Sequence, residues 1–363
     1  MVESLVGKRK FRLSLIEYLN KYAYANAKGS DLWEIVDKHA ALHGISLQNV
    51  VNAYIKQAGC PEIFVTLSDM EITVHNQTRH FIHGGMRDDD TKWTIPIHYR
   101  TNSQPESRLQ WMRASQNKVS WPLFKSSKWV VANTDSLSYV RVLYDAKNYA
   151  ELAKQLLSDH TVFSAVERTM ILVNAFDFAM SSKLNIKAYI NLLQYASEEM
   201  DYSVWLAISA QMNYIDSLIQ ETPFVNIFRV LVYTLEHDIY QKEENLQDFQ
   251  RTLVSRPYEK IGWSTNTSMT PAQKDLQATL IRNACRLRNR DCIKQAHLRY
   301  KEWIMKDKKP SLELFMLILS EGVRQGGRQA WDSAYATFLE SKEQDKRVLT
   351  AMASTTRLTL ISR

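Results

Sequence analysis

Residues 51–67, VNAYIKQAGCPEIFVTL, contain the point at which the pattern of the chain changes, and this point decides the fold class. Before Gly59 the apolar residues recur every three or four positions, which is typical of a helix with one buried face. Pro61 biases the residue before it away from helix, so the helix is expected to stop ahead of it. From Glu62 the spacing falls toward two, which is typical of β-strands. The stretch therefore predicts a boundary between a helical segment and a β segment.

Different patterns stand on the two sides of this boundary. Residues 1–59 indicate helices, with a buried stripe expected at the helical spacing of Phe11, Leu15, Tyr18, Leu19 and Tyr22. Residues 60–145 contain seven short β-rich runs separated by polar turns, which predict a small β-sandwich or barrel. The runs are EIFVTL, MEITVHN, HFIHG, KWTIPIHYR, SRLQWMRAS, KWVVAN and YVRVLYD.

Residues 146–363 are predicted to be helical almost throughout. Capping boxes at Ser164–Glu167 and Thr270–Gln273 mark two helix starts. Helices joined by short loops predict an irregular HEAT- or armadillo-like array, and we expect it to be truncated because no polar closing helix precedes Arg363. The chain is therefore predicted to be an α+β multidomain protein, mainly α, with domains at 1–59, 60–145 and 146–363.

The composition is that of an ordinary globular protein with a modest formal net charge of +7. Lys and Arg are densest over Arg282–Lys309, which is either a nucleic-acid patch or a solvated helix face. We predict the solvated face and no nucleic-acid partner, because no nucleic-acid motif accompanies the stretch. No run of about 18 apolar residues exists, so no membrane span is predicted. Glu3 and Lys8–Lys10 interrupt the start of the chain, so no signal peptide is predicted either.

The three cysteines are too few for a disulfide-built scaffold. Cys285 and Cys292 lie seven positions apart and could pair, which would leave Cys60 alone. On one continuous helix they would be two turns apart and too distant, whereas a turn over 287–290 would make a disulfide possible. Asn76 and Asn266 stand in N-x-S/T sequons, so they are candidate glycosylation sites that favour a secreted context.

The stretch HAALH, residues 39–43, has the histidine spacing of a zinc-binding helix. It puts His39 and His43 on one helix face, and Glu62 follows at the spacing of a third zinc ligand. Ala40, however, stands where zinc hydrolysis needs a carboxylate as general base. Glu62 also opens a strand pattern instead of lying on a second helix. We therefore predict no metal ligand and no catalytic residue in this chain.

Four stretches, in chain order, resemble the C-terminal part of gluzincin zinc aminopeptidases of the aminopeptidase N and endoplasmic reticulum aminopeptidase type. They are FRLSLIEYLNKYAYANAKGSDLW (11–33), VNAYIKQAGCPEIFV (51–65), KWVVANTDSLSYVRVLYD (128–145) and RTMILVNAFDFA (168–179). Tyr54, Ser138 and Asn174 depart from the family's Trp, Gly and Asp at packing and turn positions. ACRLRNRDC (284–292) is similar to the family's cysteine pair between two helices, which favours the disulfide and an oxidising compartment.

The resemblance implies a helical end of a thermolysin-like catalytic domain, a small β-sandwich and a helical domain that covers the active site and binds peptide. The family's cofactor is zinc and its substrates are peptides. Its helical domain can form homodimers, and its members are secreted or membrane-anchored ectodomains. The family's H-E-x-x-H helix, third zinc ligand and G-A-M-E-N loop would precede Met1, and none of them is in this chain. We therefore expect the chain alone to be inactive and to hold no zinc.

Two functions follow from this resemblance. The chain is either the non-catalytic C-terminal region of a zinc-dependent aminopeptidase, or a stand-alone pseudo-enzyme or helical scaffold that binds peptides or proteins. We favour the first. We also expect residues 1–59 to expose an apolar face, because the domain they would pack against is not part of the chain.

Overall fold

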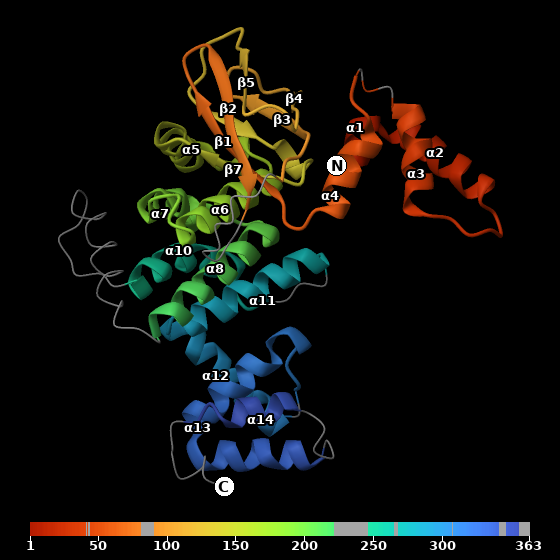
Figure 1. Cartoon of the computed structure of the whole chain (residues 1–363). Coiled ribbons are helices and arrows are strands. Elements are labelled where there is room, and N and C mark those ends of the chain that lie inside the picture. Colours follow the sequence, from red (N-terminus) through yellow and green to blue (C-terminus); the bar gives the residue numbers. More distant parts are fainter. Residues whose placement is uncertain are drawn as a thin grey trace. The chain divides into compact units, whose positions relative to one another are not determined.

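The computed structural model describes residues 1–40, 42, 44–80, 91–220, 246–264, 268–306, 308–340 and 346–355 (Figure 1). Helix predominates in these residues, and the strands all lie between Pro61 and Tyr144. The prediction of a mainly helical chain with a small β segment is confirmed at this level. The chain divides into two compact units, Met1–Gln194 and Tyr195–Arg363. The three domain boundaries expected from the sequence stay a prediction.

Four helices open the first unit. They are α1 (Val2–Val6), α2 (Lys8–Lys21), α3 (Gly29–Ala40) and α4 (Leu47–Lys56). Ser46 begins α4 as its N-cap, since its side chain accepts a hydrogen bond from the backbone N–H of Asn49 at 3.3 Å. Val36, Leu47 and Val51 form the centre of a small apolar core between these helices.

Helix α2 forms as predicted, but its apolar stripe is not buried. Phe11, Leu15, Tyr18 and Tyr22 are only partly buried, and Leu19 is 66% exposed. Helical spacing predicts which residues share a face, but it carries no information on what covers that face. In the described part of the chain, α2 therefore presents an apolar surface to solvent.

The expected helix-to-strand boundary is confirmed. Helix α4 ends at Lys56, and β1 begins at Pro61. Between them Gly59 has a φ of +87°, a left-handed conformation that glycine adopts without strain. A Cβ at this position would also lie 2.9 Å from Cγ of Arg79. A glycine is therefore required for both backbone and packing reasons.

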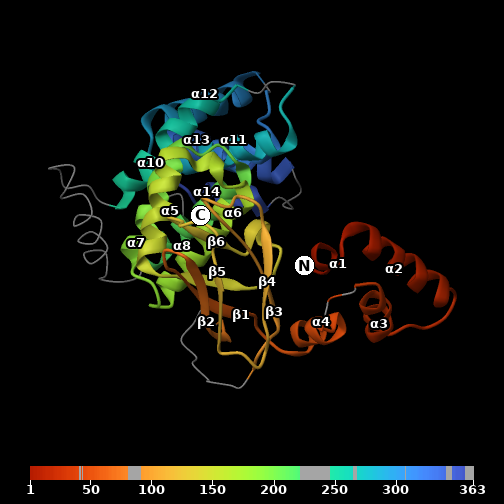
Figure 2. The ribbon, with the colours of Figure 1, turned by 90° about the horizontal axis from the view of Figure 1, so that it is seen from above.

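The described residues of the β segment form two sheets, which Figure 2 shows from above. The first has strand order β5-β2-β1-β7, with β1 and β7 parallel and the other pairs antiparallel, and the second has order β4-β3-β6. Tyr99 of the second sheet packs against Trp121 of the first, with ring centroids 5.0 Å apart. The strands are β1 (Pro61–Leu67), β2 (Glu71–Arg79), β3 (Ile95–Thr101), β4 (Arg108–Met112), β5 (Lys118–Pro122), β6 (Val130–Ala132) and β7 (Arg141–Tyr144).

Six of these strands coincide with runs expected from the sequence, whereas β5 was not expected. Its burial pattern shows one buried residue, Trp121, among exposed and half-buried neighbours. Such a short strand gives little periodic signal. The run HFIHG begins at His80, and its other residues, 81–84, lie outside the described part of the chain.

Three helices complete the first unit: α5 (Ala146–Asp159), α6 (Ala165–Met180) and α7 (Ile186–Leu193). The predicted capping box of Ser164 and Glu167 opens α6. Glu167 also receives two hydrogen bonds from Arg100 of β3, at 2.8 and 2.6 Å. This bidentate ion pair joins the second sheet to α6.

The second unit is helical in its described residues. Its helices are α8 (Tyr202–Gln220), α10 (Leu246–Ile261), α11 (Pro271–Arg286), α12 (Arg290–Lys306), α13 (Leu312–Glu340) and α14 (Lys346–Met352). The capping box of Thr270 and Gln273, with Pro271 in the first turn, opens α11 as predicted. Helix α11 contacts α8, α10 and α12, and α13 contacts α12 and α14.

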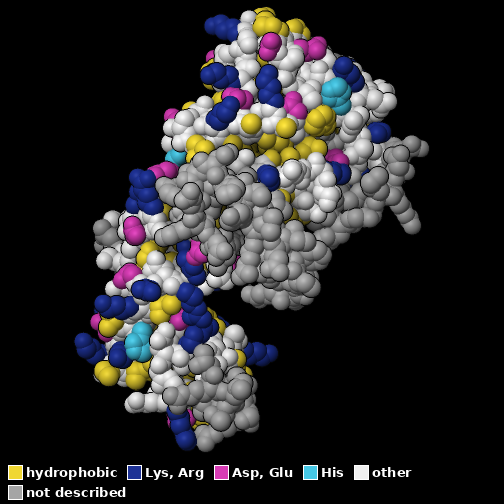
Figure 3. Space-filling view, turned by 90° about the vertical axis from the view of Figure 1, so that its left-hand side faces the viewer, with side chains coloured by type: hydrophobic (Ala, Val, Ile, Leu, Met, Phe, Trp, Pro, Cys, Tyr) yellow, Lys and Arg dark blue, Asp and Glu magenta, His cyan; other side chains and the backbone are white. Residues whose placement is uncertain are grey.

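Surface charge is mixed on the face drawn in Figure 3. Lys and Arg side chains are spread over its visible surface, with Asp and Glu side chains between them. This distribution agrees with a solvated protein surface more than with a continuous basic face. In the part of the chain that the structure describes, no helix is both long and apolar enough to cross a membrane.

Candidate functional site

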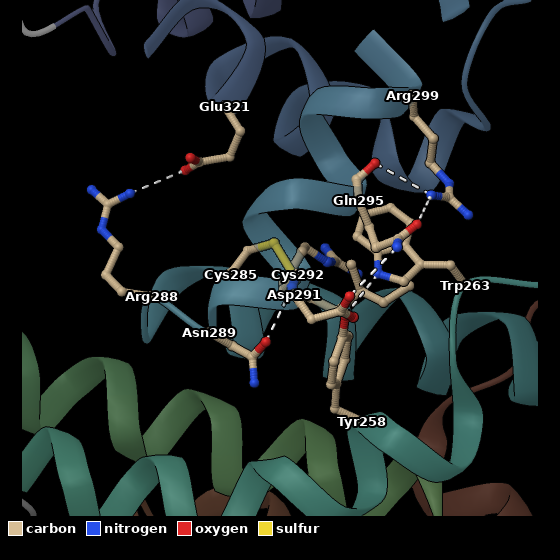
Figure 4. The surroundings of a disulfide bond; sticks show 12 residues. Tyr258, Trp263, Cys285, Arg288, Asn289, Asp291, Cys292, Gln295, Arg299 and Glu321 are labelled. Atoms are coloured by element: carbon tan, nitrogen blue, oxygen red, sulfur yellow. Dashed lines mark hydrogen bonds and ion pairs between the residues drawn. A yellow bond between two sulfur atoms is a disulfide. The ribbon is translucent and has the colours of Figure 1, made fainter. Parts of the chain in front are cut away.

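The cysteine pair lies at the junction of two helices in the second unit (Figure 4). Helix α11 ends at Arg286 and α12 begins at Arg290, so the turn that a disulfide requires is present. Arg288 has a φ of +62° in this turn, and Asn289 accepts a hydrogen bond from the backbone N–H of Cys292 at 3.0 Å. The Cα atoms of Cys285 and Cys292 lie 5.2 Å apart, and a disulfide joins them.

A chain of polar and aromatic contacts lies beside the disulfide (Figure 4). Tyr258 donates a hydrogen bond to Asp291 at 2.7 Å, and the indole N–H of Trp263 donates to the Tyr258 hydroxyl oxygen at 2.9 Å. The guanidinium of Arg299 lies 4.3 Å from the ring centroid of Trp263, a cation–π contact. Burial, and the hydrogen bond to Asp291, raise the pKa of Tyr258, so its hydroxyl stays protonated near neutral pH.

The turn between the cysteines also contacts α13. Arg288 lies 3.5 Å from a carboxylate oxygen of Glu321, and Arg324 donates to the same carboxylate at 2.9 Å. Glu321 is buried. A buried carboxylate is stabilised by such pairing, so the ion pairs help hold the turn against α13.

His39, the first histidine of the HAALH stretch, has no contact with Glu62 among the described residues. His39 lies 2.6 Å from a carboxylate oxygen of Glu17, and His43 lies outside the described residues. Glu62 lies in β1, as its strand pattern predicted, and its carboxylate contacts Thr78, His80 and Lys183. Within the described ranges, no group of three or more His, Cys, Asp or Glu side chains is placed to hold a metal ion.

The cluster around Glu62 was missed at the sequence level. Its carboxylate accepts a hydrogen bond from Thr78 at 2.9 Å, contacts Nδ1 of His80 at 2.9 Å, and binds the ammonium group of Lys183. Burial raises the pKa of Glu62, but the hydrogen bonds from His80, Lys183 and Thr78 outweigh burial and lower it overall. Lys183 is 121 residues away in the chain, so no local pattern could have indicated this contact.

A second charge pair lies near this cluster. Arg141 of β7 lies 3.1 Å from Asp177 of α6 and donates a hydrogen bond to Asn174 at 3.2 Å. Burial raises the pKa of the Cys60 thiol, so this free cysteine is a weak nucleophile at neutral pH. The contacts of Arg141 with Asp177 and Asn174 join β7 to α6.

Of the two candidate glycosylation sites, only Asn76 lies in the described part of the chain. Asn76 lies in β2 with an exposed side chain and a φ of +52°, which asparagine tolerates better than most residues. Its backbone N–H donates to the carbonyl of Asn117 at 3.1 Å. Asn266 lies outside the described residues. Exposure leaves Asn76 accessible, and its modification stays a prediction.

The chain matches known proteins along its whole length. The family model of the ERAP1-like C-terminal domain matches residues 129–363. The thyrotropin-releasing hormone-degrading ectoenzyme of Mus musculus is 24% identical over 389 residues, which cover 100% of this chain and 34% of the relative. Glutamyl aminopeptidase of Bos taurus is 22% identical over 372 residues, covering 100% of this chain and 36% of the relative. Endoplasmic reticulum aminopeptidase 1 of Mus musculus is 21% identical over 367 residues, covering 94% and 37%.

These matches confirm the resemblance to the C-terminal part of the aminopeptidases. The chain spans about a third of the length of the curated relatives that it matches. The family match begins at Trp129, just before β6, and takes in the disulfide and all helices from α5 onward. The chain therefore belongs to the family of ERAP1-like C-terminal domains.

Proposed function

We propose that this chain is the non-catalytic C-terminal region of a zinc-dependent aminopeptidase that trims peptides from their N-termini. One observation supports this most directly: between 94% and 100% of the chain aligns with about a third of the length of each of these relatives. The sequence contains none of the family's zinc-binding or substrate-loop motifs. Its contribution to such an enzyme would therefore be structural and substrate-binding.

In this proposal each segment has its own role. Residues 1–59 are the helical end of the thermolysin-like domain, and residues 60–145 are a β-sandwich that acts as a spacer. Residues 146–363 form a HEAT-like helical domain that covers the active site, binds peptide and can mediate a homodimer. The contacts of α11 with α8, α10 and α12 support an array of this kind. A secretory or extracellular location agrees with the similarity to an ectoenzyme, the thyrotropin-releasing hormone-degrading ectoenzyme of Mus musculus.

Size and activity together test the proposal. An antibody against the second unit should detect, in cells that express the gene, a protein of about three times the 42.2 kDa of this chain, since the relatives are about that much longer. The purified chain should release no product from aminoacyl p-nitroanilides and should contain far less than one zinc per chain. Full-length glutamyl aminopeptidase serves as the positive control.

The stand-alone scaffold is the competing outcome. A band at about 42 kDa alone, with no larger form in any extract, would favour a pseudo-enzyme or peptide-binding scaffold. Aminopeptidase activity with stoichiometric zinc in the isolated chain would contradict both functions.

A further inference from the structure

A pocket of about 570 Å³ lies in the second unit, between the residues that follow α10, the C-terminal half of α12 and the start of α13. This volume is typical of small-molecule sites. We propose that the pocket binds an organic oxyanion, a carboxylate or a phosphate, that carries an attached apolar group. The proposal goes beyond peptide trimming, because such binding needs no catalytic centre.

The charged residues of the pocket favour an anion. Arg299, Lys308 and Lys309 line it, and Glu302 is the single acidic residue among the lining residues. Glu302 lies 3.6 Å from Lys308 and offsets that charge. Arg299 and Lys309 therefore leave a net positive charge in a concave site, where an anion gains more than at an open surface.

Arg299 is held in place and still has donors to offer. Its Nη1 donates to the backbone oxygen and the side-chain Oε1 of Gln295, at 3.2 and 2.9 Å. Among the described residues, its Nε and Nη2 have no hydrogen-bond partner. Burial lowers the pKa of Arg299, but guanidinium stays charged at neutral pH. Two N–H groups in a planar fork match the two oxygens of a carboxylate or phosphate.

Trp263 fixes the orientation of this guanidinium (Figure 4). Its ring stacks against Arg299 with 4.3 Å between the guanidinium carbon and the ring centroid. Its indole N–H is held by Tyr258, which is in turn held by Asp291. The cation is therefore pre-organised, which reduces the entropy cost of binding.

Apolar and hydroxyl groups complete the pocket. Leu298, which is 45% exposed, lines the pocket together with the buried residues Leu314 and Ile318. Ser264 and Ser311 also line the pocket, and the hydroxyl group of Ser264 can supply a further donor. An anion joined to an aromatic or aliphatic group fits this lining better than a bare ion. The basic run Arg282–Lys309 thus contributes a directed site as well as a solvated surface.

Isothermal titration calorimetry on the full chain tests the site with three probes: phenyl phosphate, N-acetyl-phenylalanine and the neutral N-acetyl-phenylalanine amide. We expect at least one anion to bind with a Kd at least tenfold lower than that of the amide. Arg299→Gln should weaken that binding at least tenfold. Arg290→Gln is the matched control, because Arg290 begins the same helix, is exposed and does not line the pocket.

The outcomes separate the sources of the anion. Binding of the carboxylate alone favours a peptide terminus or acidic side chain, and binding of the phosphate alone favours a phosphorylated metabolite. Lys309 is exposed, so Lys309→Gln should not disturb folding. This variant should weaken the binding of the anion several-fold. Equal affinity for anion and amide, or equal effects of Arg299→Gln and Arg290→Gln in folded variants, would overturn the site. None of these results depends on aminopeptidase activity.

Discussion

The carboxylate of Glu62 in β1 lies 2.9 Å from Nδ1 of His80, which directly follows β2, and it also binds Lys183. Lys183 lies between α6 and α7. One carboxylate thus joins two neighbouring strands to the helices that pack beside them. The side chains of Glu62 and His80 are only 10% and 5% exposed. Their pairing therefore takes place largely out of water, where the loss of one partner is costly.

Glu62→Gln is expected to destabilise the first unit by about 3 kcal/mol, because it leaves His80 and Lys183 without their carboxylate. Hydrogen exchange of the peptide that covers β1 measures this locally. Glu151→Gln is the control, since Glu151 pairs with the exposed Lys154 and such pairs contribute at most about 1 kcal/mol. Equal protection of β1 in the two variants would contradict a stabilising role for the buried cluster.

The same carboxylate predicts an acid-sensitive contact. The folded-state pKa of Glu62 lies below its ordinary value, so its contribution is fully present above the unfolded pKa, about 4.3. That contribution is lost as the pH falls through the lower folded-state pKa. The protection of β1 against hydrogen exchange should therefore fall more steeply between pH 6 and pH 3 in the wild type than in Glu62→Gln. Parallel profiles would rule out this assignment.

The disulfide is expected to stabilise the α11–α12 junction. Cys285→Ala with Cys292→Ala should lower the stability of the second unit by about 2–3 kcal/mol, as estimated from the chain entropy of a short closed loop. Dithiothreitol, which reaches the sulfur atoms once the junction opens on heating, should lower the melting temperature of the wild type but leave that of the double variant unchanged. Cys60→Ala is the control, because Cys60 is a free thiol. Two or more thiols titrated in the denatured, unreduced protein would show that the disulfide does not form.

Close packing at Gly322 predicts a glycine-specific position. A Cβ there would lie 2.2 Å from the ring of Tyr300, whose hydroxyl is held by the Ala330 carbonyl at 3.1 Å. Gly322→Ala should therefore destabilise the α12–α13 contact by about 1–3 kcal/mol, measured by the rate of limited proteolysis. Gly29→Ala is the matched control, since a Cβ there meets nothing within 4 Å. Similar proteolysis rates for the two variants would contradict the packing argument.

Asn76 is expected to carry a glycan when the chain is made in the secretory pathway. Its side chain is exposed, and it begins an N-x-T sequon. The wild type should migrate more slowly on a gel than Asn76→Gln, by the mass of one glycan. Endoglycosidase treatment of the wild type should abolish this shift. Thr78→Ser preserves the sequon and should keep the shift. An unshifted wild type, in cells that glycosylate a co-expressed reporter, would count against the site.

Local signals in the sequence predicted the parts of the structure that depend on a few neighbouring residues. Ser164 and Glu167 specify a helix start within four positions, and the capping box is present. The stripe on α2 was right as a helix but wrong as a buried face, because periodicity does not report what covers Leu19. The contact of Glu62 with Lys183 depends on chain segments brought together only by the fold. Such contacts leave no spacing that a single sequence reveals.

The pocket, like the Glu62 cluster, could not be predicted from the sequence. The basic composition of Arg282–Lys309 was visible, but composition cannot show which cation has donors free to bind a ligand. The stacking of Arg299 on Trp263 joins residues 36 positions apart, across helices whose packing the sequence did not specify. A site of this kind therefore becomes recognisable only when the tertiary structure is known.

The burial of Cys285 and Cys292 has a consequence for when their bond can form. Neither side chain has any solvent-exposed surface in the folded unit. Thiol–disulfide exchange requires direct attack on a sulfur atom, so a folded α11–α12 junction excludes both oxidants and reductants. The oxidation state is then fixed while the chain folds and is retained afterwards. The presence of the disulfide in a folded molecule would therefore show that the molecule folded in an oxidising compartment.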